Sequence, residues 1–297
     1  MAIYMLMMLL AGASYGFVSP VLRLSYAHGF TVQAMTDIQY VLAFGVLWIL
    51  AAFRHKGARI SGSQWILILV IGLCNAAVSY CYYRALTVLP ASLGIILLFQ
   101  FAWMTVIIDI VVKRRWPSPM KWVGLVAIVI GTLLAVGLKM SDWRHIPLWA
   151  IGLGLMAAVS YAFNLYLSEY NDMAVSPELR SALVVTVAML LMFIPFPPGQ
   201  LMHAMARPML FYWGGWISFL SQALPTIFIL VSIPRIGGRM GGILGTIELP
   251  TAIFGAWLIN HEFVNWMRWS GVILILLGIV VSEMTLKRRK RRMQPMV

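Results

Sequence analysis

The apolar residues of this chain stand in long uninterrupted blocks, separated by short polar or charged stretches. Each block holds about 20 residues, the length of helix that crosses a hydrocarbon core of roughly 30 Å. The connections are short, so the pattern predicts an all-α polytopic membrane protein with no inserted soluble domain. We expect ten transmembrane helices at 2–22, 32–53, 64–86, 92–112, 120–138, 148–167, 179–197, 210–233, 240–259 and 266–286.

Composition agrees with a membrane location. Hydrophobic residues make up 62% of the 297 residues and charged residues only 10%, which excludes an ordinary soluble domain. The first block lacks the basic n-region of a signal peptide, so we expect it to remain as a helix. The two cysteines, Cys74 and Cys81, lie about 10.5 Å apart along one predicted helix, too far for a disulfide. No metal or redox motif is present, and the sequence predicts no cofactor.

The basic residues predict the orientation of the chain. With both termini in the cytoplasm, 16 of the 22 Lys and Arg residues fall on the cytoplasmic side and 6 on the other. This asymmetry follows the positive-inside rule, so we expect a multi-pass cell-membrane protein with both termini cytoplasmic. The basic tail at 287–297 suits anionic lipid headgroups, and the net charge of +13 therefore does not indicate a nucleic-acid partner.

The two halves of the sequence resemble each other at an offset of about 147 residues. Met120-Lys121-Trp122-x-Gly124 returns as Met267-Arg268-Trp269-x-Gly271, and Gly94-Ile95 with Gln100 returns as Gly242-Ile243 with Glu248. Packing alone explains the single glycines and aromatic residues, but it requires no such period. Because each half holds five predicted helices, the second half enters the membrane from the opposite face, as in transporters with inverted repeats. The expected units are 1–138, 147–286 and the tail 287–297.

This set of features resembles the EamA-type transporters of the drug/metabolite transporter superfamily. The resemblance rests on the five-plus-five duplication, on Leu249-Pro250 inside the ninth helix with His261-Glu262 at its end, and on Trp269-x-Gly271 followed by Gly278 in the tenth. It implies a carrier with a central cavity built largely from helices one, three, four, six, eight and nine, which usually exports small polar or amphipathic metabolites. The fourth helix lacks the proline and terminal glutamate of the ninth, so the halves are expected to differ in function.

Glu248 is the strongest candidate for a functional residue. It lies near the middle of the ninth predicted helix, where a charged side chain costs roughly 2.5 to 3.5 kcal/mol on insertion scales. Pro250 lacks a backbone donor and is expected to open the helix near Thr246, so that a carboxylate and a freed carbonyl face a cavity. A buried acid that ionises when the cavity opens to water is a workable proton carrier. The alternative is a protonated Glu248 in one interhelical hydrogen bond.

Other polar residues lie at helical spacing inside the predicted spans. Gln100 occupies the position in the fourth helix that corresponds to Glu248, and both are expected at mid-depth near a pseudo-two-fold axis. Each of these side chains either lines a wet cavity or forms a helix–helix contact. The candidate substrate-binding residues are Glu248, Gln100, Asn75, Asn164 and Gln222, with Tyr15, Tyr161 and Trp103 as aromatic walls.

The sequence favours a secondary transporter over the other classes of membrane protein. A membrane-embedded enzyme would need a nucleophile and base or a clustered acid and metal set, and no such motif is present, so no enzymatic activity is expected. A non-transporting scaffold leaves the repeat and Glu248 without a purpose. The predicted function is alternating access, with protons as a candidate coupling ion, for a small-molecule substrate whose identity the sequence does not reveal.

Overall fold

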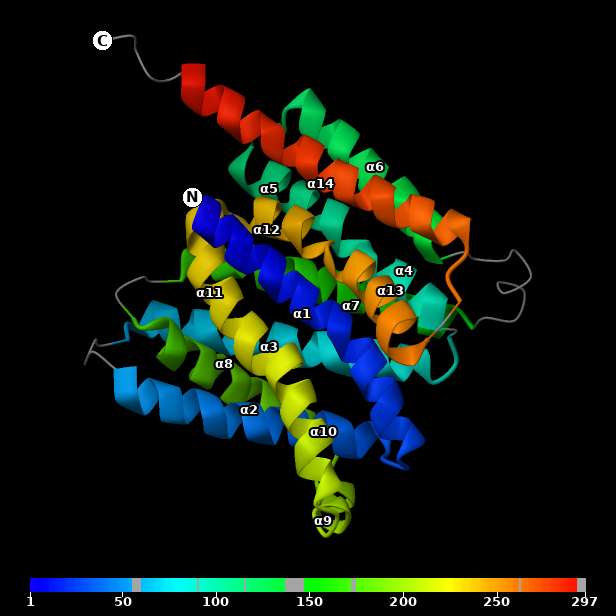
Figure 1. Cartoon of the computed structure of the whole chain (residues 1–297). Coiled ribbons are helices and arrows are strands. Elements are labelled where there is room, and N and C mark those ends of the chain that lie inside the picture. Colours follow the sequence, from blue (N-terminus) through cyan, green and yellow to red (C-terminus); the bar gives the residue numbers. More distant parts are fainter. Residues whose placement is uncertain are drawn as a thin grey trace.

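The computed structural model of the chain is built of helices, and the residues it describes contain no β-strand (Figure 1). It describes the chain except residues 55–59, 90, 115, 137–146, 172–174, 262 and 293–297. The side chains of 54, 86, 91–93, 136, 200 and 283–292 also lie outside the description. Glu262 and the side chains of the basic tail predicted at 287–297 therefore fall outside the described part of the chain.

The helices follow the predicted blocks closely in both halves. The first half holds α1 (Ala2–Ala27), α2 (Val32–Arg54), α3 (Gly62–Leu86), α4 (Ala91–Phe99), α5 (Phe101–Lys113) and α6 (Pro119–Val136). The second half holds α7 (Leu148–Leu167), the 3-10 turn η2 (Ser168–Tyr170), α8 (Pro177–Met192), α9 (Gly199–Ala204), α10 (Met209–Ser218), the π-helical turn η3 (Phe219–Ala223), α11 (Leu224–Ile236), α12 (Gly238–Gly245), α13 (Glu248–Asn260) and α14 (Trp266–Arg292).

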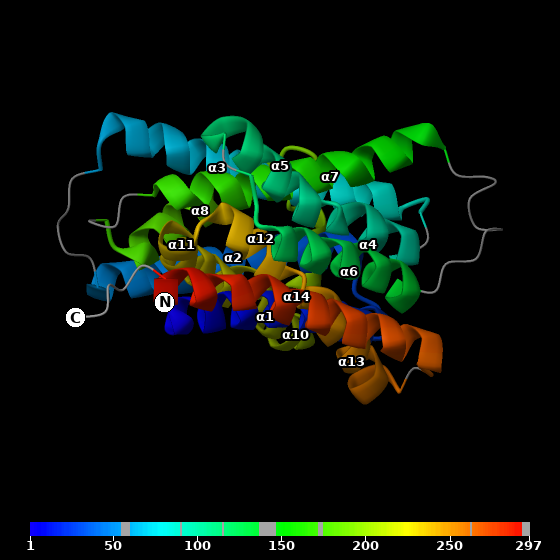
Figure 2. The ribbon, with the colours of Figure 1, turned by 90° about the horizontal axis from the view of Figure 1, so that it is seen from above.

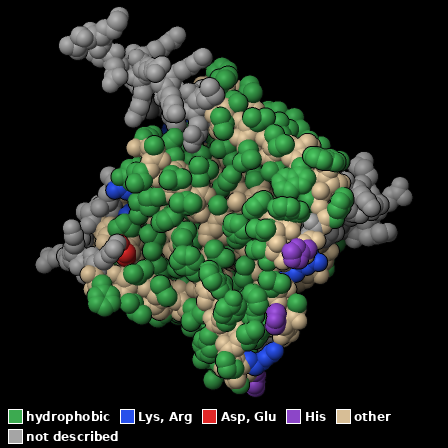
Figure 3. Space-filling view, in the orientation of Figure 1, with side chains coloured by type: hydrophobic (Ala, Val, Ile, Leu, Met, Phe, Trp, Pro, Cys, Tyr) green, Lys and Arg blue, Asp and Glu red, His purple; other side chains and the backbone are tan. Residues whose placement is uncertain are grey.

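The outer surface is apolar, as a lipid-facing surface must be. Seven described helical stretches are long and apolar enough to cross a membrane, and two shorter apolar helices run over Pro119–Ala135 and Trp266–Ser282. On the face shown in Figure 3, hydrophobic side chains cover the middle of the molecule, and the visible Lys, Arg and His side chains lie toward its edges. The chain is therefore a multi-pass, all-helical membrane protein.

Two of the predicted membrane helices are broken near their middle. The sequence predicted an opening near Thr246, next to Pro250, but no break in the fourth predicted helix. Between α4 and α5 the break lies at Gln100, whose side-chain amide donates to the carbonyl of Ile96 at 2.8 Å. Between α12 and α13 it lies at Thr246 and Ile247, a few residues before Pro250. Because proline has no N–H, the Thr246 carbonyl accepts instead from the N–H of Leu249 at 3.3 Å. The carbonyl that the sequence predicted to be free is therefore hydrogen-bonded.

The start of a helix in the first half recurs 147 residues later in the second half at four places. The residue pairs are 62 and 209, 91 and 238, 101 and 248, and 119 and 266. The caps agree as well. Arg114 ends α5 with φ of 50° and His261 ends α13 with φ of 54°, and these are the non-glycine residues with positive φ in the described part of the chain. The period detected in the sequence thus recurs in the local backbone geometry.

The helices α6 and α14 lie side by side and run antiparallel (Figures 1 and 2). Their contact is made by glycines, since a Cβ on Gly131 would lie 2.9 Å from the carbonyl oxygen of Gly271. A Cβ on Gly124 would lie 2.6 Å from the carbonyl oxygen of Gly278. Absence of side chains at these positions allows the two backbones to approach closely, as small-residue motifs do in membranes.

The start of α1 and the end of α14 lie at the same end of the helical bundle (Figures 1 and 2). We call this the terminal end. The central part of the bundle is packed around α1, α7, α12 and α13, which supply most of its largest buried cluster. Close backbone contact brings α1 against α13, because a Cβ on Gly16 would meet the Glu248 carbonyl and the Thr251 hydroxyl. This packing sets the position of Glu248 inside the bundle.

Candidate functional site: a polar and aromatic cavity

A cavity lies inside the bundle in two adjoining chambers of about 140 Å³ and about 100 Å³. Its walls come from α1, α3, α4, α7, η3 and α13, which are the six segments that the family resemblance implies. Both chambers share Glu248, Gln222, Ser79 and Tyr15. Residues from distant parts of the sequence therefore meet in one polar space within an otherwise apolar bundle.

Glu248 is the first residue of α13 and lines both chambers. The break before it places the carboxyl group at the N-terminal end of a half-helix inside the membrane. The partial positive charge of a helix N-terminus favours a carboxylate there. Pro250 occupies the first turn of the same half-helix, where a missing N–H costs little, and it is buried. The predicted partnership of Glu248 and Pro250 thus takes the form of a broken helix with an acid at the break.

Asn75, Ser79 and Gln222 reach the cavity from α3 and η3. Behind them the fully buried Tyr40 of α2 bonds to two of these residues. Its hydroxyl donates to Asn75 Oδ1 at 3.0 Å and lies 2.7 Å from the Ser79 hydroxyl. Gln222 belongs to a π-helical turn, a feature found often at functional sites. The sequence analysis missed Tyr40, because nothing in a single sequence places α2 behind this wall.

Two predicted residues of α7, Tyr161 and Asn164, line the smaller chamber. Asn164 also serves the helix packing, since its amide donates to the carbonyl of Ile71 on α3 at 3.3 Å. Tyr161 packs edge-on against Tyr15, with ring centroids 6.4 Å apart. Both tyrosines therefore form an aromatic wall of the cavity. Asn164 both lines the cavity and forms a helix–helix contact, the two alternatives that the sequence left open.

Two other predicted residues, Gln100 and Trp103, do not line either chamber. The Trp103 indole N–H donates to Gln100 Oε1 at 2.6 Å, and the Gln100 amide donates to the backbone of its own helix. Trp103 packs with Ala102 and Val106 on α5. These contacts fit the alternative of a core hydrogen bond, and a part for Gln100 or Trp103 in substrate binding stays a prediction.

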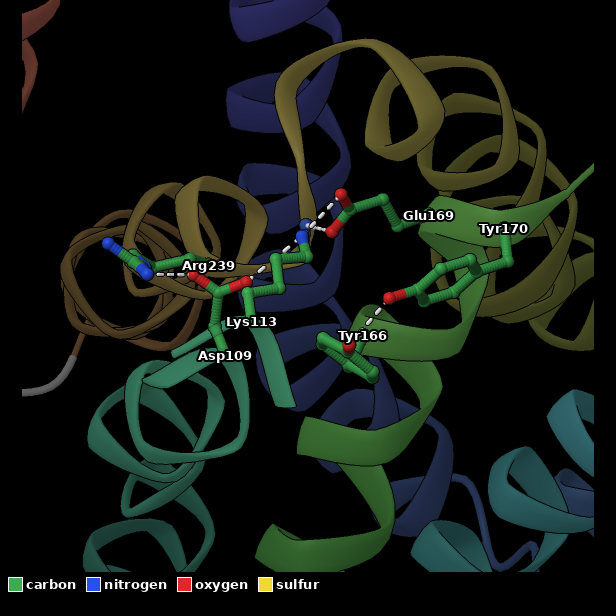
Figure 4. A network of polar contacts seen from close by, with 7 residues as sticks. Asp109, Lys113, Tyr166, Glu169, Tyr170 and Arg239 are labelled. Carbon is green, nitrogen blue, oxygen red and sulfur yellow. Dashed lines mark hydrogen bonds and ion pairs between the residues drawn. The ribbon is translucent and has the colours of Figure 1, made fainter. Parts of the chain in front are cut away.

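A network of charged residues lies at the terminal end (Figure 4). Asp109 of α5 pairs with Lys113 at 3.0 Å and with Arg239 of α12, and Lys113 pairs with Glu169 of η2 at 2.5 Å. Glu169 also accepts the backbone N–H of Gly238 at 3.1 Å, at the start of α12. The network joins α5, η2 and α12.

Asp37 lies near the start of α2, outside both chambers. In the structure it is 1% exposed, and within the described part of the chain neither carboxyl oxygen has a hydrogen-bond partner. The reason is packing, because α10 lies against this part of α2, where a Cβ on Gly214 would meet the side chain of Ile38. Among the described residues, no group of three His, Cys, Asp or Glu side chains is placed to hold a metal ion.

The fold and the cavity define a multi-pass membrane protein with an internal polar chamber. Residues 2–137 match the EamA-like transporter family. The chain is 23% identical over 247 residues to a threonine/homoserine exporter, RhtA, of Salmonella typhimurium, with 83% of this chain and 81% of that protein covered. It is 22% identical over 250 residues to the RhtA of Escherichia coli, with 84% and 82% covered.

A solved crystal structure shares the fold, with a TM-score of 0.79 at 14% identity over 97% of this chain and 98% of that one. The chain is a member of the drug/metabolite transporter superfamily, with an EamA-type first half. The family resemblance found in the sequence is thereby confirmed.

Proposed function

We propose that the protein is a secondary active exporter of small polar metabolites of amino-acid size, working by alternating access. The observation that carries the proposal is the polar cavity around Glu248 in the middle of a transporter fold. The two relatives named as threonine/homoserine exporters support a substrate of this size, as do chambers of about 140 Å³ and about 100 Å³. No observation of this kind supports the alternative of a membrane-embedded enzyme.

The proposed architecture is ten membrane crossings in two inverted repeats, residues 1–138 and 147–286, followed by the basic tail 287–297. Three observations support it: the recurring helix starts, the paired caps at Arg114 and His261, and the contact between α6 and α14. In that contact Gly124 packs against Gly278, and Gly131 packs against Gly271. The offset of 147 residues instead relates Gly124 to Gly271 and Gly131 to Gly278. Such a reciprocal, antiparallel contact is what a two-fold axis between two equivalent helices produces.

The proposed orientation places the terminal end in the cytoplasm. The excess of Lys and Arg on the loops and tail of that side supports it. The larger chamber is lined by Leu22, Tyr82 and Tyr83, which belong to the C-terminal halves of α1 and α3, on the other side of the bundle. At the terminal end, the network of Asp109 and Glu169 ties three helices together. We infer an outward-facing state whose cytoplasmic end is closed by ion pairs.

Protons are the proposed coupling ion, with Glu248 as their carrier. Its place at a helix break inside the cavity supports this, because water reaches the carboxyl group only when the cavity opens. Asp37 and Asp109, which are also buried, do not line either chamber.

Transport by purified protein in liposomes tests the proposal directly. Vesicles loaded with a panel of labelled amino acids, amines and nucleobases should release at least one of them faster than protein-free vesicles do. An imposed pH gradient should drive that flux. Release of no compound under any gradient, by protein that elutes as a folded species, would contradict the proposal.

A further inference from the structure

The charge balance of the cavity indicates which group of the substrate the protein recognises. Glu248 is the one charged side chain among the described residues that line the two chambers, and no Lys, Arg or His is among them. A substrate carboxylate would find no cationic partner there, and a buried charge without a partner is costly. An ammonium group, in contrast, finds a carboxylate.

Aromatic rings surround the same carboxyl group. Tyr15, Tyr82 and Phe99 line the larger chamber with Glu248, and Tyr15 and Tyr161 line the smaller one. Tyr161 is further held by Phe101, with ring centroids 4.5 Å apart. Ring faces attract cations, and this attraction is strongest where water is excluded. A carboxylate among aromatic rings is therefore a setting suited to an amine.

The rest of the lining is polar but neutral. Asn75, Ser79 and Gln222 offer amide and hydroxyl groups, and Tyr40 holds the first two in place from behind. The neighbouring Ser221 donates to Gln39 Oε1 at 2.9 Å, which fixes the π-helical turn against α2. Groups of this kind pair with the hydroxyl, amide or ester groups of a ligand as well as with a carboxylate, at no cost in charge.

We propose that the substrate's primary ammonium group is the recognised feature, held by Glu248 among Tyr15, Tyr82 and Tyr161, and that a substrate carboxylate is dispensable. The substrate class is thus small primary amines, including amides and esters of amino acids, alongside amino acids themselves. The inference deepens the proposed export function and rests on it.

Three molecules of nearly the same shape separate the two groups: L-threonine, L-threoninamide and 3-hydroxybutyrate. The first carries both charges, the second only the ammonium, and the third only the carboxylate. Calorimetric titration of the purified protein, and exchange of each compound across liposomes, measure recognition. We expect threoninamide to bind at least as tightly as threonine, and 3-hydroxybutyrate to bind at least about tenfold more weakly, since loss of a buried charge pair costs more than 1.4 kcal/mol.

The matched variants are Glu248→Gln and Glu178→Gln. Glu248→Gln should remove the preference for the amine over the hydroxy acid, whereas Glu178→Gln, at the start of α8 and outside the cavity, should keep it. Binding of 3-hydroxybutyrate as tight as that of threoninamide would overturn the inference while leaving export intact. Transport of some other compound, without any preference for an amine, would overturn it too. Absence of all transport would instead contradict the proposed function.

Discussion

Gly124 of α6 and Gly278 of α14 hold their helices in backbone contact. A Cβ on Gly124 would lie 2.6 Å from the Gly278 carbonyl oxygen, and a Cβ on Gly278 would lie 2.7 Å from the Gly124 carbonyl oxygen. The contact is reciprocal, so each glycine makes room for the backbone of the other. It explains why both helices carry glycine at these positions, and it predicts that a single methyl group here separates two long helices.

Gly124→Ala should therefore lower the stability of the folded protein. The added methyl group meets both the Gly278 carbonyl and the Ser282 side chain. Overpacking of this kind costs about 1–3 kcal/mol. The control is Gly45→Ala in α2, where nothing lies within 4 Å of the added methyl and helix propensity favours alanine by about 0.5–1 kcal/mol. Thermal unfolding in detergent compares the two; equal melting temperatures would contradict this account of the contact.

The inverted topology predicts that residues 147 apart lie on opposite sides of the membrane. Single cysteines at Lys121 and Arg268, in a background without Cys74 and Cys81, should react with an impermeant maleimide from opposite faces. Lys121 should react from the side of the basic tail, because that side carries the excess of basic residues. Labelling of both positions from one face would rule out the inverted repeat.

Much of the fold could be predicted, because the lengths of the apolar blocks and the 147-residue offset between the halves can be read directly from the sequence. The start of α7 at Leu148 and of α14 at Trp266 agree with the predicted blocks to the residue. The break at Gln100 was missed, since an apolar segment has the same composition whether its helix is continuous or broken, whereas Pro250 indicated the opening near Thr246. The short α9 was missed too, because six residues carry no helical period.

The candidate site was predictable only where a polar residue stood out against apolar neighbours. Glu248, Asn75 and Gln222 stood out in this way, and the structure brings them to one cavity. Gln100 stood out equally, yet its side chain bonds to Trp103 and its own helix. The position of a residue along its predicted helix indicates its depth in the membrane. The direction in which its side chain points depends on how the helix is rotated about its axis, which a single sequence does not determine.

Asn75 and Asn164 should differ when each is replaced by leucine. Asn164 donates to the backbone of α3, so Asn164→Leu removes a hydrogen bond between helices and should reduce folded yield, with a cost of about 0.6 kcal/mol or more. Asn75→Leu removes a cavity amide together with its bond from Tyr40, but the Tyr40 hydroxyl keeps the Ser79 hydroxyl as a partner, so this variant should weaken transport at nearly normal yield. Size-exclusion yield and transport per folded protein separate the two effects. Equal loss of yield in both variants would show that Asn75 is structural.

The ion network predicts which end of the cavity opens when a charge is removed. Asp109→Asn leaves Lys113 and Arg239 without their shared carboxylate and should loosen the terminal end. A cysteine at Ser79, inside the cavity, should then be labelled faster from the side of the basic tail. Arg207→Gln is the control, because Arg207 contacts the carbonyls of His28 and Gly29, near the C-terminal end of α1. Unchanged labelling in Asp109→Asn would show that the network is not a closure.

The central claim, that Glu248 is the working residue of a proton-coupled carrier, is tested most directly by transport in Glu248→Gln. Glutamine keeps the size and hydrogen-bonding capacity of the side chain but cannot bind or release a proton. In liposomes the variant should lose accumulation driven by a pH gradient while it keeps exchange of internal for external substrate, although exchange is weakened where the substrate is an amine. Its rate should also lose its dependence on pH. Accumulation equal to that of the parent at every pH would contradict the claim and leave Glu248 a structural residue.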